Sequence, residues 1–479
     1  LRTERDRFGR ETRKSVRSGS IERGAWRYEW GMADRLVSKE NELTGTVMRY
    51  DYDRFDFLIR QETTKGSATD VIYRMPDFVG NLYGTPERKD RKYGAGGRLL
   101  EDAECIYHYD DEGNLVFREF RQPREDAVRH DRRRMEREYG IRRPVTDMGW
   151  IYEWTSGGML RRVVRPDGRS VEFRYDALGR RTAKQYLGKV TRWVWDGNTP
   201  LHEWVAAVTD NDGREEASCP DGNSLTTWVF EEGTFIPAAK IRGDRQCSIV
   251  SDYMGTPVQM YDSEGNKTWD CTLDIYGKVT DFRGESLNDC PFRFQGQYED
   301  IETGLYYNRF RYYDTNIGNY LNQDSNGLIG GNPTLYGYVK NINAQIDLYG
   351  LCVYELVATS DGWYPVYEKG KLNPTSYIRL NKGDVYKIGE SQNPQRRYSQ
   401  VRLNEARINK STATSVAINT NGKPKLDANG NIMTAGLQMD IDQNTVGNTK
   451  QVDRSIETQR IKTYEQNNHH LPAGNKTYH

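Results

Sequence analysis

The chain of 479 residues has 69 Lys and Arg against 69 Asp and Glu, and its mean hydropathy of −0.88 is low. It nevertheless contains 32 Tyr, 10 Trp and 45 Gly, which excludes an intrinsically disordered chain because such chains lack aromatic residues. No apolar run approaches the roughly 18–20 residues of a membrane-spanning helix, so we expect no membrane span. The composition therefore indicates extended β structure whose strands are covered by large aromatic rings.

Six cysteines are scattered without a CxxC spacing, so the sequence predicts neither a zinc site nor a disulfide framework. The charge is unevenly distributed along the chain. From Cys352 onward there are 17 Lys and Arg against 12 Asp and Glu, a net charge of +5, which leaves −5 on the first 351 residues. A basic C-terminal piece on an acidic carrier favours a polyanion as the target of that piece.

Degenerate repeats fill the first half of the chain. Each has an aromatic-Asp pair, then a Gly-containing turn, then alternating polar and apolar residues, as in 48–62, 105–120, 163–186 and 259–282. Period-two alternation around Asp-Gly or Gly-Asn turns predicts β-hairpins. Recurrence at roughly 20–25 residues predicts a solenoid in which each unit buries its face against its neighbours. We interpret the Tyr-Asp pairs as scaffold and expect no catalytic role for them.

The repeats resemble YD repeats, and residues 291–351, from PFRFQGQYED to QIDLYGL, resemble the core segment that closes Rhs proteins. The resemblance implies a mainly β fold, with a YD-repeat shell over 1–290, a core plug over 291–351 and a small α/β domain over 352–479. It also implies that a variable toxic domain is held inside the shell. The opening residues, LRTERDRFGRE, favour the C-terminal part of a longer cage.

In this family the chain is cut after the Leu that ends the core segment, so the resemblance implies a cut between Leu351 and Cys352. The implied cutter is a pair of aspartates, Asp324 in NQDSNG and Asp347 in QIDLYG. Two carboxylates that share a site cannot both ionise easily. One can stay protonated and polarise the peptide carbonyl while the other activates water.

Alternatives stay open for these residues. Asp324 and Asp347 both lie in Asp-x-x-Gly contexts, where a carboxylate often caps a turn. Cys352 at the cut could instead act through its thiol, as in an intein, although no His or Asn constellation flanks it. The Pro that follows each Asp in the family is replaced by Ser325 and Leu348, which leaves open whether cleavage occurs.

The piece after the cut has a length typical of one small α/β domain. Its expected strands span 353–358, 362–369 and 384–391, and its expected helices span 393–409 and 451–468. Short islands in this piece resemble the GIY-YIG endonuclease layout and, more closely, the URI-like nuclease toxins at Rhs termini. These islands are GWY (362–364), KIG (387–389), Arg397, Glu457 and PAGN (472–475).

The resemblance implies roles for residues on the first strands. Tyr364 assists water activation, with Tyr354 in CVYEL as an alternative first-motif residue. Lys387 takes the place of the Tyr of the second motif and could act as a base with a lowered pKa. Tyr386 is one residue off and, by strand alternation, lies on the opposite face. The alternative without catalysis is that the tyrosines pack in the interior and that Lys387 is a solvated residue of an edge strand.

The remaining candidates follow the strands. Arg397 would clamp the phosphate with its planar fork. Glu457 would hold one divalent ion, Mg²⁺ or another divalent cation, of which Mg²⁺ is a hard cation that prefers oxygen. Asn475 is a further candidate for the same site. The alternatives are a plain basic helix face, a surface glutamate, and solvated tail histidines at His469 and His470.

The preferred interpretation is a polymorphic Rhs toxin that cleaves itself and releases a metal-dependent endonuclease, with DNA as the preferred substrate. The resemblance implies type VI secretion through an adaptor or spike protein bound by the missing N-terminal part, delivery into the cytoplasm of competing bacteria, and a cognate immunity protein. The alternatives are an RNase or tRNase on the same carrier, or a non-enzymatic YD-repeat structural or adhesive protein. Convergence of Lys387, Arg397 and Glu457 on one cleft would discriminate between enzyme and scaffold.

Overall fold

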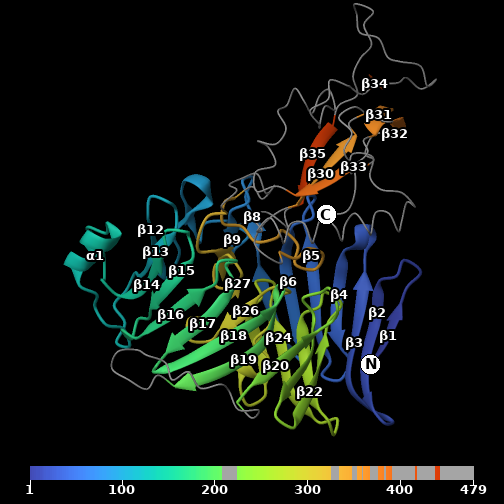
Figure 1. Cartoon of the computed structure of the whole chain (residues 1–479), viewed down its shortest axis with the longest axis horizontal. Helices are drawn as coiled ribbons and strands as arrows, with labels where there is room; N and C mark the ends of the chain where they lie inside the picture. Colours follow the sequence, from blue (N-terminus) through green and yellow to red (C-terminus); the bar gives the residue numbers. More distant parts are fainter. Residues whose placement is uncertain are drawn as a thin grey trace, which may run out of the picture. The chain divides into compact units, whose positions relative to one another are not determined.

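The computed structural model describes residues 1–207, 224–324, 334–347, 353–358, 360–366, 376–381, 385–390, 416–417 and 437–442. The chain divides into two compact units, one of residues 1–323 with 333–348 and one of residues 324–332 with 349–479. Strands dominate the described residues of both units (Figure 1). The mainly β class predicted from composition and repeats is therefore confirmed.

The first unit begins with a seven-stranded antiparallel sheet in chain order. Its strands are β1 (Arg2–Arg5), β2 (Glu11–Ser18), β3 (Ile21–Trp30), β4 (Leu36–Asn41), β5 (Thr46–Tyr52), β6 (Leu58–Lys65) and β7 (Ala68–Tyr73), with a 3-10 turn η1 (Met32–Asp34) and a following hairpin of β8 (Met75–Pro76) and β9 (Leu82–Tyr83). On β5, Met48 and Tyr50 are buried while Arg49 and Asp51 are exposed. This period-two pattern leaves one face of the sheet apolar.

A sixteen-stranded antiparallel sheet follows, again with every strand bonded to its neighbours in sequence. It contains β10 (Lys92–Tyr93), β11 (Leu99–Glu101), β12 (Cys105–Tyr109), β13 (Leu115–Phe120), β14 (Gly149–Trp154), β15 (Leu160–Val164), β16 (Ser170–Tyr175), β17 (Arg181–Tyr186), β18 (Lys189–Asp196), β19 (Thr199–Ala207), β20 (Thr226–Phe230), β21 (Pro237–Arg242), β22 (Arg245–Ser251), β23 (Pro257–Asp262), β24 (Lys267–Leu273) and β25 (Val279–Arg283), with 3-10 turns η2 (Ala95–Gly97) and η3 (Leu287–Asp289). The hairpins predicted from the four repeats are confirmed, by β5–β6, β12–β13, β16–β17 and β23–β24.

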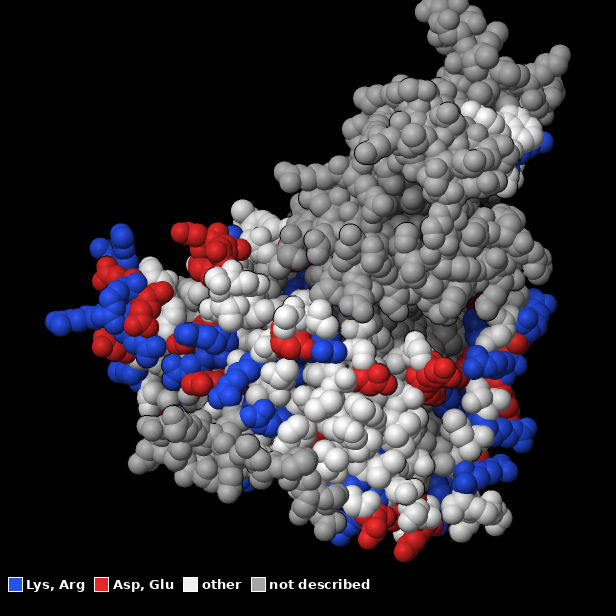
Figure 2. Space-filling model, viewed as in Figure 1, with Lys and Arg blue, Asp and Glu red and all other residues white. Residues whose placement is uncertain are grey.

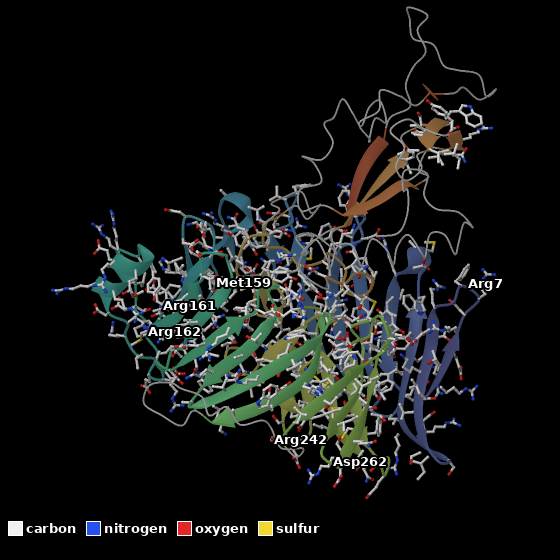
Figure 3. All side chains as sticks on the ribbon, in the orientation of Figure 1. Arg7, Met159, Arg161, Arg162, Arg242 and Asp262 are labelled. Atoms are coloured by element: carbon white, nitrogen blue, oxygen red, sulfur yellow. The ribbon has the colours of Figure 1, made fainter. Side chains whose placement is uncertain are left out.

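The hairpin turns share a geometry that explains the repeated Asp-x-x-Gly motif. In one of them, the Asp176 carboxylate accepts hydrogen bonds from the backbone N–H groups of Leu178 and Arg180, both at 2.9 Å. Gly179 has a φ of 72°, in the left-handed region that side chains disfavour. Asp262, which ends β23 and is labelled in Figure 3, caps its turn in the same way. The motif therefore specifies the turn of a hairpin. This agrees with the interpretation of the repeats as a structural scaffold.

The first unit curves so that its two large sheets meet. Lys39 of β4 contacts the Asp252 carboxylate at 3.0 Å, and Lys65 of β6 contacts Asp281 of β25 at 2.7 Å. Aromatic and aliphatic side chains from both sheets share one buried cluster, which includes Trp26, Tyr28, Val258 and Tyr261. Strands more than 200 residues apart therefore pack against each other, and the two sheets together are called the wall below.

A small core sheet lies against this wall. It consists of β26 (Tyr298–Asp300), β27 (Leu305–Asn308), β28 (Arg311–Asp314) and β29 (Asn319–Tyr320), and every one of these residues is buried. Tyr307 and Tyr312 join the cluster of the sixteen-stranded sheet, whereas Tyr306 and Tyr313 join the cluster shared with the seven-stranded sheet. Successive side chains of a strand point to opposite faces, so the core sheet is covered by apolar contacts on both.

Among the described residues the only α-helix is α1 (Arg132–Tyr139), inserted between β13 and β14. It begins at the N-cap Asp131 and ends at Gly140 in the left-handed conformation. Beside it, Glu153 of β14 contacts Arg161 and Arg162 of β15, which Figure 3 labels. Figure 2 shows acidic and basic side chains interspersed over the visible face of the first unit, in keeping with its small net charge.

In the second unit, the described residues form two three-stranded sheets. One has the order β33–β30–β35 and the other β32–β31–β34, formed by β30 (Val353–Ala358), β31 (Gly362–Val366), β32 (Ser376–Leu380), β33 (Val385–Glu390), β34 (Val416–Ala417) and β35 (Leu437–Asp442). The three predicted strands are confirmed as β30, β31 and β33. The predicted helices over 393–409 and 451–468 lie outside the described residues. A search of the described residues for a helix long and apolar enough to cross a membrane finds none.

Candidate functional site

The carboxylate of Asp347 lies in a buried polar cluster at the end of the core segment. Asp347 is only 3% exposed. Its Oδ2 accepts hydrogen bonds from the Tyr320 hydroxyl at 2.7 Å and from Nη2 of Arg311 at 3.1 Å. Nδ2 of Asn308 donates to the backbone carbonyl of Asp347 at 2.9 Å and to the Tyr320 oxygen at 2.6 Å. Two side chains of the core segment therefore donate to the Asp347 carboxylate, and a third binds its backbone carbonyl.

The core sheet positions the partners of Asp347. Asn308 ends β27 and lies directly opposite Arg311, which begins β28. A tight turn joins them, in which Arg309 has a φ of 58°. Tyr320 ends the neighbouring β29, and its ring lies 3.7 Å below the Arg311 guanidinium carbon. Since the sheet is buried on both faces, these polar groups need partners, and they hydrogen-bond to one another.

The two groups that contact the Asp347 carboxylate, the Tyr320 hydroxyl and the Arg311 guanidinium, are both hydrogen-bond donors. Burial raises the pKa of Tyr320 well above its usual value, and the negative charge of Asp347 raises it further, while Arg311 opposes this. Tyr320 therefore keeps its proton and remains a hydrogen-bond donor. A nearby guanidinium and a hydroxyl donor both stabilise the charged form of a carboxylate. When it is ionised, a carboxylate can take a proton from water, which is the role of a general base.

Among the other residues of the predicted cut, Asp324 alone lies within the described part of the chain. Asp324 is described but belongs to the second unit, so its pairing with Asp347 stays a prediction. Leu351, Cys352, Ser325 and Leu348 lie outside the described residues. The turn-capping alternative for Asp347 stays open, because the three residues that follow it are also undescribed.

In the second unit, two candidate tyrosines pack against each other. Tyr364 of β31 and Tyr386 of β33 are both 0% exposed, and their ring centroids lie 5.8 Å apart. The Tyr364 hydroxyl donates to the backbone carbonyl of Ser360 at 2.8 Å, and the Tyr386 hydroxyl donates to that of Pro365 at 2.6 Å. These rings join the two sheets of the unit. Packing is therefore one established role of both residues.

Two further nuclease candidates, Tyr354 and Lys387, lie on strands that pair with each other. Tyr354 of β30 lies opposite Gly389 of β33, and Leu356 lies opposite Lys387, so Tyr354 and Lys387 take diagonal positions on paired strands. Tyr364 is in the other sheet. The candidates outside the described residues are Arg397, Glu457, Asn475, His469 and His470. Within the described residues no group of three His, Cys, Asp or Glu side chains could hold a metal ion.

Sequence reasoning missed the partners of Asp347. Asn308, Arg311 and Tyr320 lie at the ends of short core strands and resembled ordinary repeat residues. One signal was available in LYYNRFRYYD, where Asn and Arg are embedded in a tyrosine-rich run of the core segment. Polar residues within a strand that is apolar on both faces need specific partners.

Comparison with known proteins agrees with this architecture. Residues 2–334 match the teneurin YD-shell family. The chain is 30% identical over 315 residues to the probable deoxyribonuclease RhsB of Dickeya dadantii, covering 63% of this chain and 20% of that protein. It is 29% identical over 347 residues to the double-stranded DNA deaminase toxin A of Burkholderia cenocepacia, covering 68% of this chain and 22% of that protein. The chain thus spans about a fifth of the length of these relatives.

Among solved structures, the crystal structure of TcdB2-TccC3-TEV is similar with a TM-score of 0.41 and 18% sequence identity, covering 73% of this chain and 19% of that one. The family match ends before Asp347, and the match to RhsB covers less than two thirds of this chain. The family assignment therefore concerns the wall and most of the core segment.

Proposed function

Because this chain belongs to the teneurin YD-shell family, we propose that it is the toxin-bearing part of an Rhs effector that cleaves itself after Leu351. The observation that carries the proposal is the buried Asp347 carboxylate, held by Arg311 and Tyr320 four residues before the cut. Relatives named as a deoxyribonuclease and a deaminase toxin support the toxin assignment.

In the proposed cleavage, Asp347 is the base and Asp324 is the acid. Asp347 takes a proton from water, and the resulting hydroxide adds to the carbonyl carbon of Leu351. Asp324, protonated, donates a hydrogen bond to the carbonyl oxygen and then gives its proton to the nitrogen of Cys352 as the peptide bond breaks. Tyr320 and Arg311 keep Asp347 ionised before the reaction. The thiol of Cys352 takes no part in this route.

The released piece is proposed to be a metal-dependent endonuclease in which Lys387, Arg397 and Glu457 act together. Two observations favour Tyr354 over Tyr364 as the first-motif tyrosine: Tyr354 lies on the strand paired with that of Lys387, and the Tyr364 ring is fully buried. Glu457, with Asn475 nearby in the resemblance, would supply oxygen ligands to Mg²⁺. The ion would neutralise charge on the phosphate.

The biological setting of the proposal follows the same resemblance. The shell would keep the nuclease from the producer until delivery, with secretion through an adaptor or spike protein and entry into the cytoplasm of a competing bacterium. A cognate immunity protein would protect the producer by covering the basic piece, whose net charge is +5. DNA is the proposed substrate, and an RNase or tRNase on the same carrier is the alternative.

The test uses the full chain and the fragment that it releases. Wild type, Asp347→Asn and Asp324→Asn chains are synthesised, and the N-terminus of each product is sequenced. A wild-type fragment beginning at Cys352, absent from both variants, supports the proposed cleavage. A chain that stays intact, or a fragment beginning elsewhere, contradicts it.

The released fragment is then incubated with plasmid DNA or total RNA, in Mg²⁺ or in EDTA, beside Glu457→Ala and Arg397→Ala. DNA degradation that needs the metal and both residues supports the endonuclease. RNA degradation alone moves the assignment to an RNase or tRNase. Intact nucleic acid in every tube, from a folded fragment, leaves a structural or adhesive role.

A further inference from the structure

Arg74, between β7 and β8, is an arginine of the wall that binds the core segment. Its side chain is among the largest fully buried ones, with 2% exposure of the residue. Nη1 donates to the backbone carbonyl of Lys340 at 2.9 Å, and Nη2 donates to that of Val339 at 2.7 Å. One planar guanidinium thus binds two consecutive backbone carbonyls, the first of which lies 265 residues further along the chain.

Burial of the charged Arg74 guanidinium should lower the stability of the wall. Burial lowers the pKa of Arg74, and its Nε has no hydrogen-bond partner within the described part of the chain. A buried cation is expensive unless its donors are satisfied, so an apolar residue here would be cheaper if only wall stability mattered. The two carbonyl contacts are what the arginine adds, and they fix the backbone of the core segment.

The carbonyls held by Arg74 begin the last stretch before Asp347. The same stretch is bound by further wall residues: the Leu58 N–H donates to the Lys340 carbonyl at 3.1 Å. Downstream, Asn343 donates to the Tyr52 hydroxyl at 3.0 Å and accepts, through its backbone carbonyl, from the Tyr253 hydroxyl at 3.0 Å. Residues of β5, β6 and the β22–β23 turn therefore define the path by which the chain reaches Asp347.

We propose that Arg74 is a positioning residue for the self-cleavage, because it fixes the backbone at Val339 and Lys340 and so places the Asp347 carboxylate. This inference rests on the proposed cleavage. It makes the reaction dependent on the folded wall, since the Arg74 fork reaches the core segment only when β7 and β8 pack against it. Cleavage is then confined to chains in which wall and core have assembled.

The test compares Arg74→Ala with Arg91→Ala in the full chain during cell-free synthesis. Arg91 is a matched control, because it also donates from the wall to core carbonyls, with Nη1 at 2.7 Å from that of Ile317, but not to the stretch before Asp347. The rate of appearance of the fragment that begins at Cys352 is measured, together with the melting temperature of each chain. We expect Arg74→Ala to slow cleavage about tenfold or more and Arg91→Ala to leave it near the wild-type rate, at similar losses of melting temperature.

A second measurement separates positioning from general destabilisation. Millimolar guanidinium ion should enter the space left in Arg74→Ala, bind the two carbonyls and restore the cleavage rate, whereas Arg91→Ala should not respond. Arg74→Met fills the space with apolar atoms, so it should fold, cleave slowly and show no rescue. Arg74→Lys, which keeps a cation donor, should cleave at an intermediate rate.

Three outcomes would overturn the positioning role. They are cleavage of Arg74→Ala at the wild-type rate, equal slowing by Arg74→Ala and Arg91→Ala, and slow cleavage of Arg74→Ala that guanidinium leaves unchanged. If Arg74→Ala does not fold, the cleavage rates of Arg74→Met and Arg74→Lys are compared instead. Equal cleavage rates in these two variants would also overturn the positioning role. An intact wild-type chain would instead remove the proposed cleavage itself.

Discussion

Arg181 of β17 and Asp300 of β26 form an ion pair that joins the wall to the core sheet, with side chains only 1% and 0% exposed. The Arg181 guanidinium lies 4.5 Å from the ring centroids of both Trp193 and Tyr307. Lys184 adds a second contact to Asp300 at 3.1 Å. The core is therefore fastened to the wall by charges that water does not reach.

Removing one partner of this pair should be strongly destabilising. Asp300→Ala leaves the buried Arg181 without its counter-ion, and we expect the free energy of unfolding to fall by about 3–5 kcal/mol. Urea denaturation of the purified chain measures the change. Asp51→Ala, which breaks the surface pair with Arg60, serves as control and should cost less than about 1 kcal/mol. Equal losses in the two variants would contradict a special role of the buried pair.

The Tyr320 hydroxyl should be needed for efficient cleavage. Tyr320→Phe removes one donor to the Asp347 carboxylate, and a hydrogen bond to a charged group is worth about 1.5–3 kcal/mol, so we expect cleavage to slow by about tenfold or more. The rate is read from the appearance of the fragment. Tyr312→Phe is the control: Tyr312 is equally buried but its hydroxyl bonds to Tyr175. A Tyr320→Phe chain as fast as Tyr312→Phe would argue against the Asp347 cluster.

The stability of the first unit should depend on the charge of Asp274. This residue caps the β24–β25 turn, and burial raises its pKa from 3.8 to about 6. Because the folded pKa lies above the unfolded one, the native state binds the proton more tightly, and the stability contributed by Asp274 falls as pH rises between these values. Asp274→Asn keeps an oxygen acceptor for the turn amides. As pH rises through that window, the free energy of unfolding of Asp274→Asn should come to exceed that of wild type by at most about 3 kcal/mol. The variant should keep this advantage at higher pH.

Asp262, at an equivalent turn position, should show the opposite dependence of stability on pH. It is only partly buried, and the N–H of Asn266 lowers its pKa. Its charge therefore contributes stability above its unfolded pKa, and this contribution is lost as pH falls through the folded pKa. Asp262→Asn should be less stable than wild type at neutral pH and equal to it in acid. Melting temperatures from pH 3 to 8 test both variants, and parallel curves for the two would refute the burial argument.

The two candidate tyrosines of the nuclease should respond differently to loss of the hydroxyl. Tyr364→Phe removes a hydrogen bond inside the packed core of the second unit, so we expect a melting temperature a few degrees lower with unchanged nuclease activity. Tyr354→Phe should slow DNA cleavage by about 100-fold without a comparable loss of stability. Nuclease assays and thermal melts of the released fragment compare the two. The reverse pattern would assign the first-motif role to Tyr364.

Much of the fold follows from local patterns in the chain. The Asp-x-x-Gly turns, the tyrosines that precede them and the period-two alternation were sufficient to predict the hairpins, because an Asp cap and a glycine at positive φ act within five residues. The three strands expected in the second unit, over 353–358, 362–369 and 384–391, were also identified from short runs of the sequence. The tyrosine-rich core segment was recognisable from its own sequence, and with it Asp347.

The partners of Asp347, and the wall residues that hold the stretch before it, were decided only by the tertiary structure. Arg181 and Asp300 are 119 residues apart, and Arg74 lies 266 residues from Lys340. Local propensity carries no information about such pairs, since each residue alone resembles an ordinary strand or turn position. Their meeting depends on how the wall curves and on which face of the core sheet each side chain takes. Sequence thus determined the turns, the strands and the candidate carboxylate, while packing determined which charges are buried together and hence what that carboxylate can do.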